Sequence, residues 1–553
     1  MPDSDRHPRG TPRRAFIRLF ALLLVPPGVA ATPAPLPAPL FPELGRYRFA
    51  ADTAKPLAQQ YVDQGMLLAY GFNPAEAARS FEAATRVDPG CATCWWALAW
   101  SLGPNINTDM EAAAGDRVRA ALMEARAHSA GAGAVQQGLI AALSVRHPRG
   151  GGLDEEGYAR AMEALARRHP KDADVALFAA EAILNLHPYD WWETDGRPKP
   201  WTPRIVAELT RAMTLVPDHP GALHYWIHLQ ESSSHPHEGE AAADLLRDRV
   251  PGSGHLVHMP AHIYLRVGRY QDAILANRKS IEADRRYLDA VDAQGAYRVG
   301  YVAHNHHFLY AAAAMAGEGR LAIDAAKAAW PAACGPKPGD RSTAILQHYY
   351  VLPLYALVRF GRWNEILRDT LPPDVAEPYP LAIWHYARGT ARARLGQLAA
   401  AREDLARLDR YAADPALAKV KIKNINAAER LARIAALTLR ADIALAERKP
   451  ADAVPLLFEA TAIEDSLTYD EPHLWLAPTR HALGAALLEA GRATDAERAY
   501  REDLAHYPDN GWSLRGLATA QKKQGRQVAA QETEQRMRIA FRGADALPPA
   551  SRY

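Results

Sequence analysis

The strongest constraint on the fold is a pattern of small, aromatic and proline residues that recurs every 34 residues. One unit starts at residue 58 and the next at 92, and a second pair starts at 477 and 511. The markers of the first unit are Gly65, Ala77, Phe81, Ala84 and Pro89. Small residues let two helices approach, an aromatic ring fills the gap, and proline ends the second helix. The pattern therefore predicts helix–turn–helix units stacked along the chain.

The offsets of these markers resemble those of the tetratricopeptide repeat (TPR) family, whose period is also 34 residues. The resemblance covers roughly residues 56–540, with degenerate stretches near 105–170, 186–203 and 410–440. It implies an all-α solenoid, which we expect to span residues 43–546, followed by a tail at 547–553. In this family the second, fifth, ninth, twelfth and thirteenth residues of a unit face a concave groove, which commonly holds a peptide of a partner.

The amino end has the features of an export signal. A charged segment that begins at Arg13 precedes an apolar run at 19–25 and small residues at 29–31. Residues 13–18 resemble the core of a twin-arginine signal, and a general secretory signal with two unrelated arginines is the alternative. We expect a signal peptide at 1–31, a Pro/Ala linker at 32–42, and a mature protein that is periplasmic or extracellular.

Charge and hydropathy exclude two classes of partner. Lys and Arg number 65 against 63 Asp and Glu, so no basic surplus points to nucleic acid. The apolar run at 19–25 ends at Pro26 and is far too short to span a bilayer, so no stable membrane insertion is expected. A hydrophobic content of 48% with 23% charged residues is typical of globular proteins.

Histidine is concentrated in one part of the chain, because eleven of the 21 histidines lie between His219 and His307. Pro217 and Gly268 place the starts of two consecutive units at 220 and 254. In this register six ligand-type residues take groove positions of two neighbouring units: His224, His228 and Glu231 in the first, and His255, His258 and His262 in the second.

Residues i and i+4 of a helix lie on one face, about 5–6 Å apart at Cβ. We therefore predict that His224, His228, His258 and His262 converge on one point as primary ligands of a transition metal (Cu, Zn or Fe), with His255 as an additional ligand. Glu231 would orient a ligand or act as a base on metal-bound water. An aromatic-like groove lining, hydrogen bonding to a peptide and a pH-sensing cluster are the alternatives.

Two further histidines fall on groove positions of the next units. His306 is a second-position residue and a further expected ligand, although an insertion near 284–304 allows His304 or His307 to take its place. His348 is the second residue of the following unit and is expected to line the groove.

Other groove positions carry side chains suited to substrate binding or catalysis. Trp96 and Trp100 are the fifth and ninth residues of the unit at 92, where they would form aromatic walls for a ligand. Glu181 would place a catalytic carboxylate on the same surface. Arg266, a thirteenth-position residue, would hold a substrate carboxylate or lie on a solvated rim.

The segment from Cys91 to Cys94 has the spacing C-x-x-C, but Trp95 stands where covalent haem attachment needs histidine. A local disulfide is expected in an oxidising compartment, and a soft-metal or redox role is the alternative. This segment, H-Y-W-I-H-L-Q-E at 224–231 and H-L-V-H-M-P-A-H-I-Y at 255–264 resemble motifs of a group of exported bacterial TPR proteins. That narrower resemblance implies a class of protein and no reaction.

Together these patterns favour an exported solenoid with a transition-metal site that takes a small molecule or peptide in its groove. A metal-dependent oxidation or metal-assisted hydrolysis is the leading activity. A non-enzymatic peptide-binding scaffold and a metal storage or delivery protein are the alternatives. We expect the functional surface within residues 92–350, with 410–546 serving mainly as scaffold and cap.

Overall fold

The computed structural model describes residues 38–553, except 194–195, 292, 294–295, 336–338, 372–373 and 424. Most of the described residues are helical, and the only strands among them are β1 (Lys421–Ile422) and β2 (Asn426–Ala427), which pair antiparallel. The prediction of an all-α fold is confirmed. The expected signal peptide and residues 32–37 of the linker lie outside the described part. Within that part, no helix combines the length and hydropathy needed to cross a bilayer.

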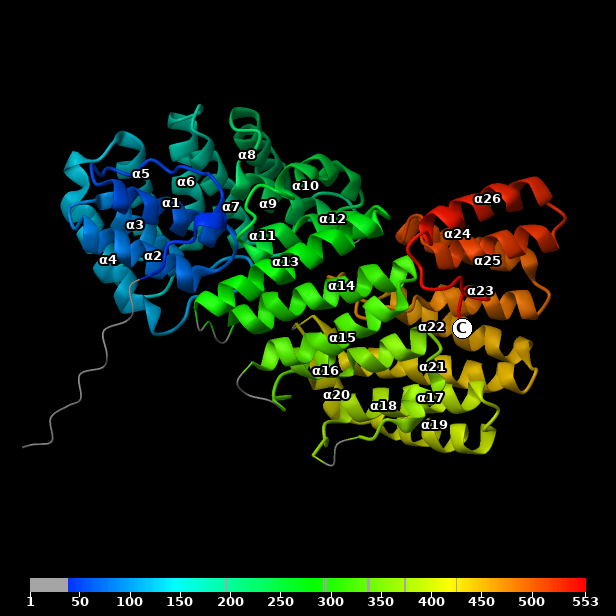
Figure 1. The fold of residues 1–553 in the computed structure, drawn as a ribbon. Helices are drawn as coiled ribbons and strands as arrows, with labels where there is room; N and C mark the ends of the chain where they lie inside the picture. The colour runs from blue at the N-terminus through cyan, green and yellow to red at the C-terminus, as the bar shows by residue number, and fades with distance from the viewer. Residues whose placement is uncertain are drawn as a thin grey trace, which may run out of the picture. The chain divides into compact units, whose positions relative to one another are not determined.

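Most helices follow one another as pairs along the chain (Figure 1). The first half contains η1 (Pro42–Leu44), α1 (Pro56–Tyr70), α2 (Pro74–Val87), α3 (Ala92–Ser101), α4 (Ala114–His128), η2 (Ser129–Gly131), α5 (Ala134–Arg146), α6 (Glu155–Arg168), α7 (Ala173–Leu186), α8 (Thr202–Leu215), α9 (Pro220–Glu231), η3 (Pro236–Gly239), α10 (Glu240–Leu246), α11 (Gly254–His258), α12 (Pro260–Arg266) and α13 (Tyr270–Ala290).

The second half contains η4 (Arg298–Val302), α14 (Ala303–Ala316), α15 (Gly319–Cys334), α16 (Ala344–Arg359), α17 (Trp363–Arg368), α18 (Pro378–Arg394), α19 (Leu398–Ala412), α20 (Pro415–Lys419), α21 (Ala428–Ala446), α22 (Pro450–Asp465), α23 (Thr479–Glu489), α24 (Ala493–His506), α25 (Gly511–Lys523) and α26 (Gln527–Ala540).

Glycine on one helix against an aromatic ring on the next explains how the pairs pack. A Cβ added to Gly65 of α1 would lie 2.4 Å from the Phe81 ring of α2. A Cβ added to Gly484 of α23 would lie 2.3 Å from the Tyr500 ring of α24. Any larger side chain would push the helices apart. The predicted α-solenoid of TPR-like helix pairs is confirmed, with its small and aromatic markers in the roles expected of them.

The histidine-rich units begin at the predicted positions, since α9 starts at Pro220 and α11 at Gly254. The first helix of the unit that begins at Gly254 is divided into α11 and α12. Pro260 has no N–H to continue the hydrogen bonding of α11, and α12 begins at this residue. One repeat further on, a π-helical turn, η4, leads directly into α14. The histidines of α9, α11, α12 and α14 meet inside the solenoid.

The inner surface of the first repeats is covered by residues 38–55, which precede α1. The Phe49 ring stacks on Trp96 of α3, with ring centroids 5.7 Å apart. The Tyr47 hydroxyl contacts the Asp174 carboxylate of α7 and lies 3.3 Å from Nε2 of His219. The chain itself therefore occupies the concave face at these positions.

Candidate metal centre

Three histidines from two helices form a first buried group: His224 and His228 of α9 and His255 of α11. One ligand nitrogen of each lies within 4.8 Å of the others, and the Nε2 atoms of His224 and His255 are 3.1 Å apart. The Phe72 ring packs against all three imidazoles, at centroid distances of 4.5, 5.7 and 5.3 Å. The group is thus shielded from water on that side.

A second group comprises His258 of α11, His262 of α12 and His304 of α14, again with one nitrogen of each within 4.8 Å of the others. The Nε2 atoms of His258 and His262 are 2.8 Å apart. Phe308, one turn after His304, packs against these three rings at 4.7, 4.4 and 4.8 Å. The two groups therefore have the same composition: three imidazoles and one phenylalanine.

The prediction of one point of convergence needs correction, because the four primary histidines are divided between these two groups. The boundary between the groups falls within α11, between His255 and His258. His255 faces back toward α9, whereas His258 and His262 face onward to α14. The groups are nevertheless adjacent, since the rings of His228 and His262 lie 5.7 Å apart.

His304, not His306, is the histidine of α14 at the centre, which corrects the expected ligand. Two residues apart on a helix is about 200° of rotation, so the two side chains leave opposite sides of α14. The π-helical turn before α14 has one residue more than an α-helical turn. It therefore changes which residues of α14 face the centre, compared with the positions expected from the repeat register.

Four of the ligand candidates have Nδ1 held by an oxygen. Nδ1 of His224 donates to the Tyr70 carbonyl at 2.6 Å, and a carbonyl can only accept. Nδ1 of His258 donates to Oδ1 of Asn277 at 2.7 Å, since Nδ2 of Asn277 already donates to the Ala273 carbonyl. His228 and His262 direct Nδ1 at carboxylates. Each ring is thereby oriented with Nε2 toward its group, as in metal sites of proteins.

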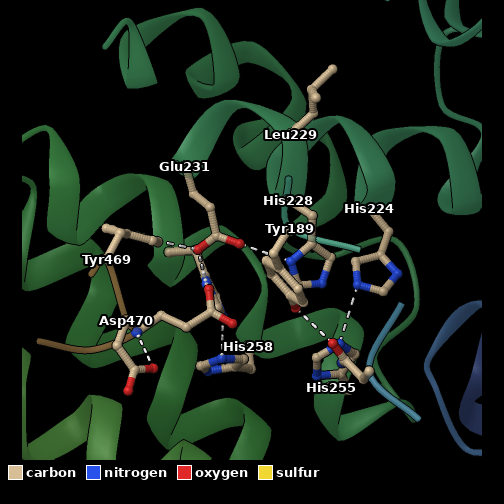
Figure 2. A network of polar contacts seen from close by, with 12 residues as sticks. Tyr189, His224, His228, Leu229, Glu231, His255, His258, Tyr469 and Asp470 are labelled. Carbon is tan, nitrogen blue, oxygen red and sulfur yellow. Dashed lines mark hydrogen bonds and ion pairs between the residues drawn. The ribbon is translucent and has the colours of Figure 1, made fainter. Parts of the chain in front are cut away.

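The carboxylate of Glu231 connects the two groups (Figure 2). Its Oε1 accepts from Nδ1 of His228 at 2.7 Å, and its Oε2 accepts from Nδ1 of His262. Tyr469 donates to the same Oε2 at 3.2 Å. Oε2 of Glu471 lies 2.8 Å from Nδ1 of His262. A third possible ligand group consists of His228, Glu231 and Glu471. It overlaps the first group, because His228 belongs to both.

Burial determines the charge of most of these imidazoles. It lowers the pKa of His228 to about 3. It also holds the pKa well below the ordinary value in His224, His255, His258 and His304. These five rings are neutral at pH 7 and retain a nitrogen lone pair for a metal.

His262 is the exception among the six. Burial would lower its pKa, but the carboxylates of Glu231 and Glu471 raise it to about 10. Burial opposes ionisation of Glu231, yet the charge on His262 and the hydrogen bonds around it hold the pKa of Glu231 below its usual value. Burial and the charge on Glu231 raise the pKa of Glu471. The centre without metal thus contains an imidazolium, on His262, beside the Glu231 carboxylate.

The donor set fits a transition-metal ion by chemistry and by spacing. Two nitrogens that bind one ion at about 2.0–2.1 Å lie about 2.8–3.4 Å apart for bond angles between a right angle and the tetrahedral value. The Nε2 pairs at 3.1 and 2.8 Å are close to that range. Nε2 of His228 is buried and has no hydrogen-bond partner among the described residues. The first group offers three neutral imidazoles and the second offers two, with a third once His262 loses its proton, and such sets suit Zn²⁺, Cu²⁺ or Fe²⁺.

Glu181, Trp96 and Trp100 lie together, away from this centre. Nε1 of Trp100 donates to Glu181 at 3.2 Å, and Trp96 is stacked between Phe49 and Trp100. All three side chains are buried, so the expectation that the tryptophans line an open groove needs correction: residues 38–55 cover them. Glu181 contacts none of the histidine groups and therefore lacks the position of a catalytic base at them.

Two other predicted groove residues also lie outside the histidine groups. Arg266 ends α12, one turn beyond His262, and lines a cavity. Nδ1 of His348 is hydrogen-bonded to the Tyr379 hydroxyl at 2.9 Å, and the His348 ring lies 5.2 Å from the His307 ring.

Cys91 and Cys94 form a disulfide at the start of α3.

Sequence reasoning missed four residues of the centre: Asn277, Tyr469, Glu471 and, as first choice, His304. Tyr469 and Glu471 come from the segment between α22 and α23, more than 200 residues along the chain from His262. The available signal was the stretch 466–478, which interrupts the repeat pattern with a run of polar and aromatic residues. Residues 410–546 were expected to serve mainly as scaffold and cap, and this segment is an exception, because Tyr469 and Glu471 contact the centre.

No family model and no curated protein matches the chain. A solved human IFIT1 dimer with m7Gppp-AAAA is similar at 12% identity, covering 89% of this chain and 91% of that chain, with a TM-score of 0.31. The APC/C hetero-tetramer Cut9–Hcn1 is similar at 14% identity over 91% and 79%, with a TM-score of 0.29. The P58(IPK) TPR domain is similar at 12% identity, covering 85% of this chain and 98% of that domain, with a TM-score of 0.23. Similarities this low carry no functional argument.

Proposed function

We propose that the chain is a metalloprotein whose six buried histidines bind two transition-metal ions, one in each three-histidine group. The observation that carries this is the orientation of the rings: Nδ1 of His224, His228, His258 and His262 is held by an oxygen acceptor, which leaves Nε2 toward the group. A histidine cluster kept only for packing has no need of such uniform orientation.

Within this proposal the chain's own residues have distinct roles. Glu231 orients one ligand of each group and keeps both rings basic. Asn277 orients His258. Phe72 and Phe308 exclude water from one side of each group. A bound ion would supply Lewis acidity or, for Cu or Fe, redox chemistry, so the activity we propose is metal-assisted hydrolysis or oxidation of a small molecule.

A metal-dependent enzyme is favoured over a peptide-binding scaffold by the state of the inner surface. A scaffold of this fold needs a long open groove, and residues 38–55 fill the first part of it. A cavity of about 770 Å³ lies instead beside Tyr469, which donates to Glu231. A cavity of this size next to a metal centre suits a small substrate.

We also propose that the protein is exported to the periplasm or beyond the cell. The segment from Arg13 to the small residues at 29–31 supports this. The Cys91–Cys94 disulfide supports it further, because disulfides persist in oxidising compartments.

Reconstitution tests the metal proposal. Chelator-treated protein would be titrated calorimetrically with Zn²⁺, and the Cu²⁺ form examined by electron paramagnetic resonance. We expect saturation at two ions per chain, imidazole nitrogen couplings in the Cu²⁺ spectrum, and release of about one proton as His262 becomes a ligand. Absence of saturable binding, or binding without nitrogen ligands, would contradict the proposal.

A further inference from the structure

A cavity of about 770 Å³ lies beside the histidine centre and is separated from it by Tyr469. Its walls come from the turn after α9, the end of α12, the segment between α22 and α23, and the end of α24. The cavity is large enough for a ligand of about ten to twenty non-hydrogen atoms.

The acidic side chains of the cavity wall already have partners. Each is held by a donor at 2.6–3.3 Å: Glu240 by Arg269, Glu464 by Thr479, Asp465 by Arg480, Asp470 by Lys423 and Asp503 by His481. Arg480 is in turn occupied by Asp465 through two nitrogens, at 2.6 and 2.8 Å. None of these groups is available to neutralise a charged ligand.

Arg266 is the wall cation without such a partner. Among the residues that the structure describes, no carboxylate lies within ion-pair distance of its guanidinium. One nitrogen, Nη2, donates to the Ser233 carbonyl at 3.2 Å, while Nε is buried without any hydrogen-bond partner in the described chain. A buried donor without a hydrogen bond costs about 1–3 kcal/mol of stability, so binding of a ligand that supplies an acceptor is favoured here.

Aromatic rings form the wall next to this cation. The guanidinium carbon of Arg266 lies 5.2 Å from the ring centroid of Tyr469. Trp475, Tyr507 and His473 continue the wall, and the ring of His473 lies 5.2 Å from that of Tyr507 and 5.7 Å from that of Tyr469. Flat apolar surfaces of this kind bind flat apolar bodies.

We propose that the cavity binds a small organic carboxylate with a flat apolar or aromatic body, its carboxylate on Arg266 and its body against Tyr469, Trp475 and Tyr507. A carboxylate would accept from Nε and a terminal nitrogen of Arg266 together, the paired geometry that guanidinium favours. Because Arg266 follows His262 by one helical turn, about 6 Å, such a ligand would lie next to the centre. That this ligand is the substrate rests on the proposed function, whereas its binding does not.

Calorimetric titration with 4-hydroxybenzoate, and with its amide as the uncharged counterpart, tests the proposal. Metal-loaded and chelator-treated wild-type protein would be compared with Arg266→Gln, Arg266→Lys and, as a control at an exposed position, Arg278→Gln. We expect the acid to bind wild type at least 10-fold tighter than the amide. Arg266→Gln should remove this preference, Arg266→Lys should retain part of it, and Arg278→Gln should leave it unchanged.

The outcomes separate this proposal from the metal proposal. Equal binding of acid and amide, an unchanged preference in Arg266→Gln, or no binding of the acid at 10 mM, about the limit of a usable millimolar site, would overturn the assignment of the cavity. Circular dichroism shows whether Arg266→Gln is folded, and Arg266→Lys carries the comparison if it is not. Acid-selective binding by a protein that takes up no metal would support the cavity and refute only the metal centre.

Discussion

Nδ1 of His228 lies 2.7 Å from Oε1 of Glu231, three residues further along α9, and the second oxygen of the same carboxylate contacts Nδ1 of His262. One buried carboxylate therefore orients a histidine in each of the two groups. Residues i and i+3 share a helix face, so the first contact is local, whereas the second depends on the packing of α9 against α12.

Replacing both His228 and His262 by alanine should abolish metal binding without unfolding the protein. These changes remove one ligand from each group, while pairs such as Gly65 with Phe81 continue to hold the helices together. Metal content would be measured by mass spectrometry and the fold by far-ultraviolet circular dichroism. His128→Ala, at an exposed position, is the control. Retention of two ions by the double variant would show that the groups are misassigned.

Asn277→Leu should weaken metal binding about 10- to 100-fold, because His258 loses the acceptor that orients its ring. Asn277→Asp keeps an acceptor at the same place and should bind metal much more strongly than the leucine variant. Competition with a chromophoric chelator measures both affinities. If the Asn277→Leu and Asn277→Asp variants bind metal with equal affinity, the side chain at position 277 does not position a metal ligand.

Glu181→Gln should change how stability depends on pH. Burial raises the pKa of the Glu181 carboxyl to about 7, against an ordinary value of 4.5, although Arg146, Trp100 and Asn185 favour its charge. The folded protein thus holds this proton more tightly than the unfolded chain, and that contribution to stability is lost as pH rises from about 4.5 through 7.

The Glu181→Gln variant does not lose this contribution to stability as pH rises. Between pH 5 and pH 8 its free energy of unfolding should therefore rise relative to wild type by about 2–3 kcal/mol. Urea unfolding at both pH values measures this. Glu156→Gln, at a side chain that is 73% exposed, should show no comparable change. A parallel pH dependence in Glu181→Gln and wild type would place the Glu181 pKa near its ordinary value.

Phe49→Ala should destabilise the first repeats by about 3–5 kcal/mol, since a buried ring stacked on Trp96 is lost. Phe458→Ala, at a side chain that is 42% exposed, is the matched control and should cost far less. A cost below about 1 kcal/mol for Phe49→Ala would mean that residues 38–55 leave the inner surface open.

The repeat pattern predicted the parts of this structure that depend on local periodicity. Pro220 and Gly254 begin α9 and α11 as the 34-residue spacing requires, and this register alone identifies five of the six clustered histidines. The sixth was missed because α13 extends to Ala290 and η4 follows it, so the period no longer applies when α14 begins.

What periodicity could not supply is contact between distant segments. Glu471 reaches His262 from a loop without repeat markers, and Phe49 reaches Trp96 from ahead of the first repeat. Neither segment has a spacing that relates it to the groove. The division of the histidines into two groups likewise depends on which neighbour each face of α11 and α12 meets, a property of packing and not of spacing.

The metal content of the protein purified from its native host is the most direct test of the central claim. The protein would be purified without chelators or metal-affinity resin and analysed by inductively coupled plasma mass spectrometry against its amino-acid concentration. The account predicts two equivalents of transition metal per chain, lost in the variant that lacks His228 and His262. Less than about 0.1 equivalent, both as isolated and after incubation with Zn²⁺, Cu²⁺ and Fe²⁺, would contradict it, since a site of this donor set binds such ions tightly.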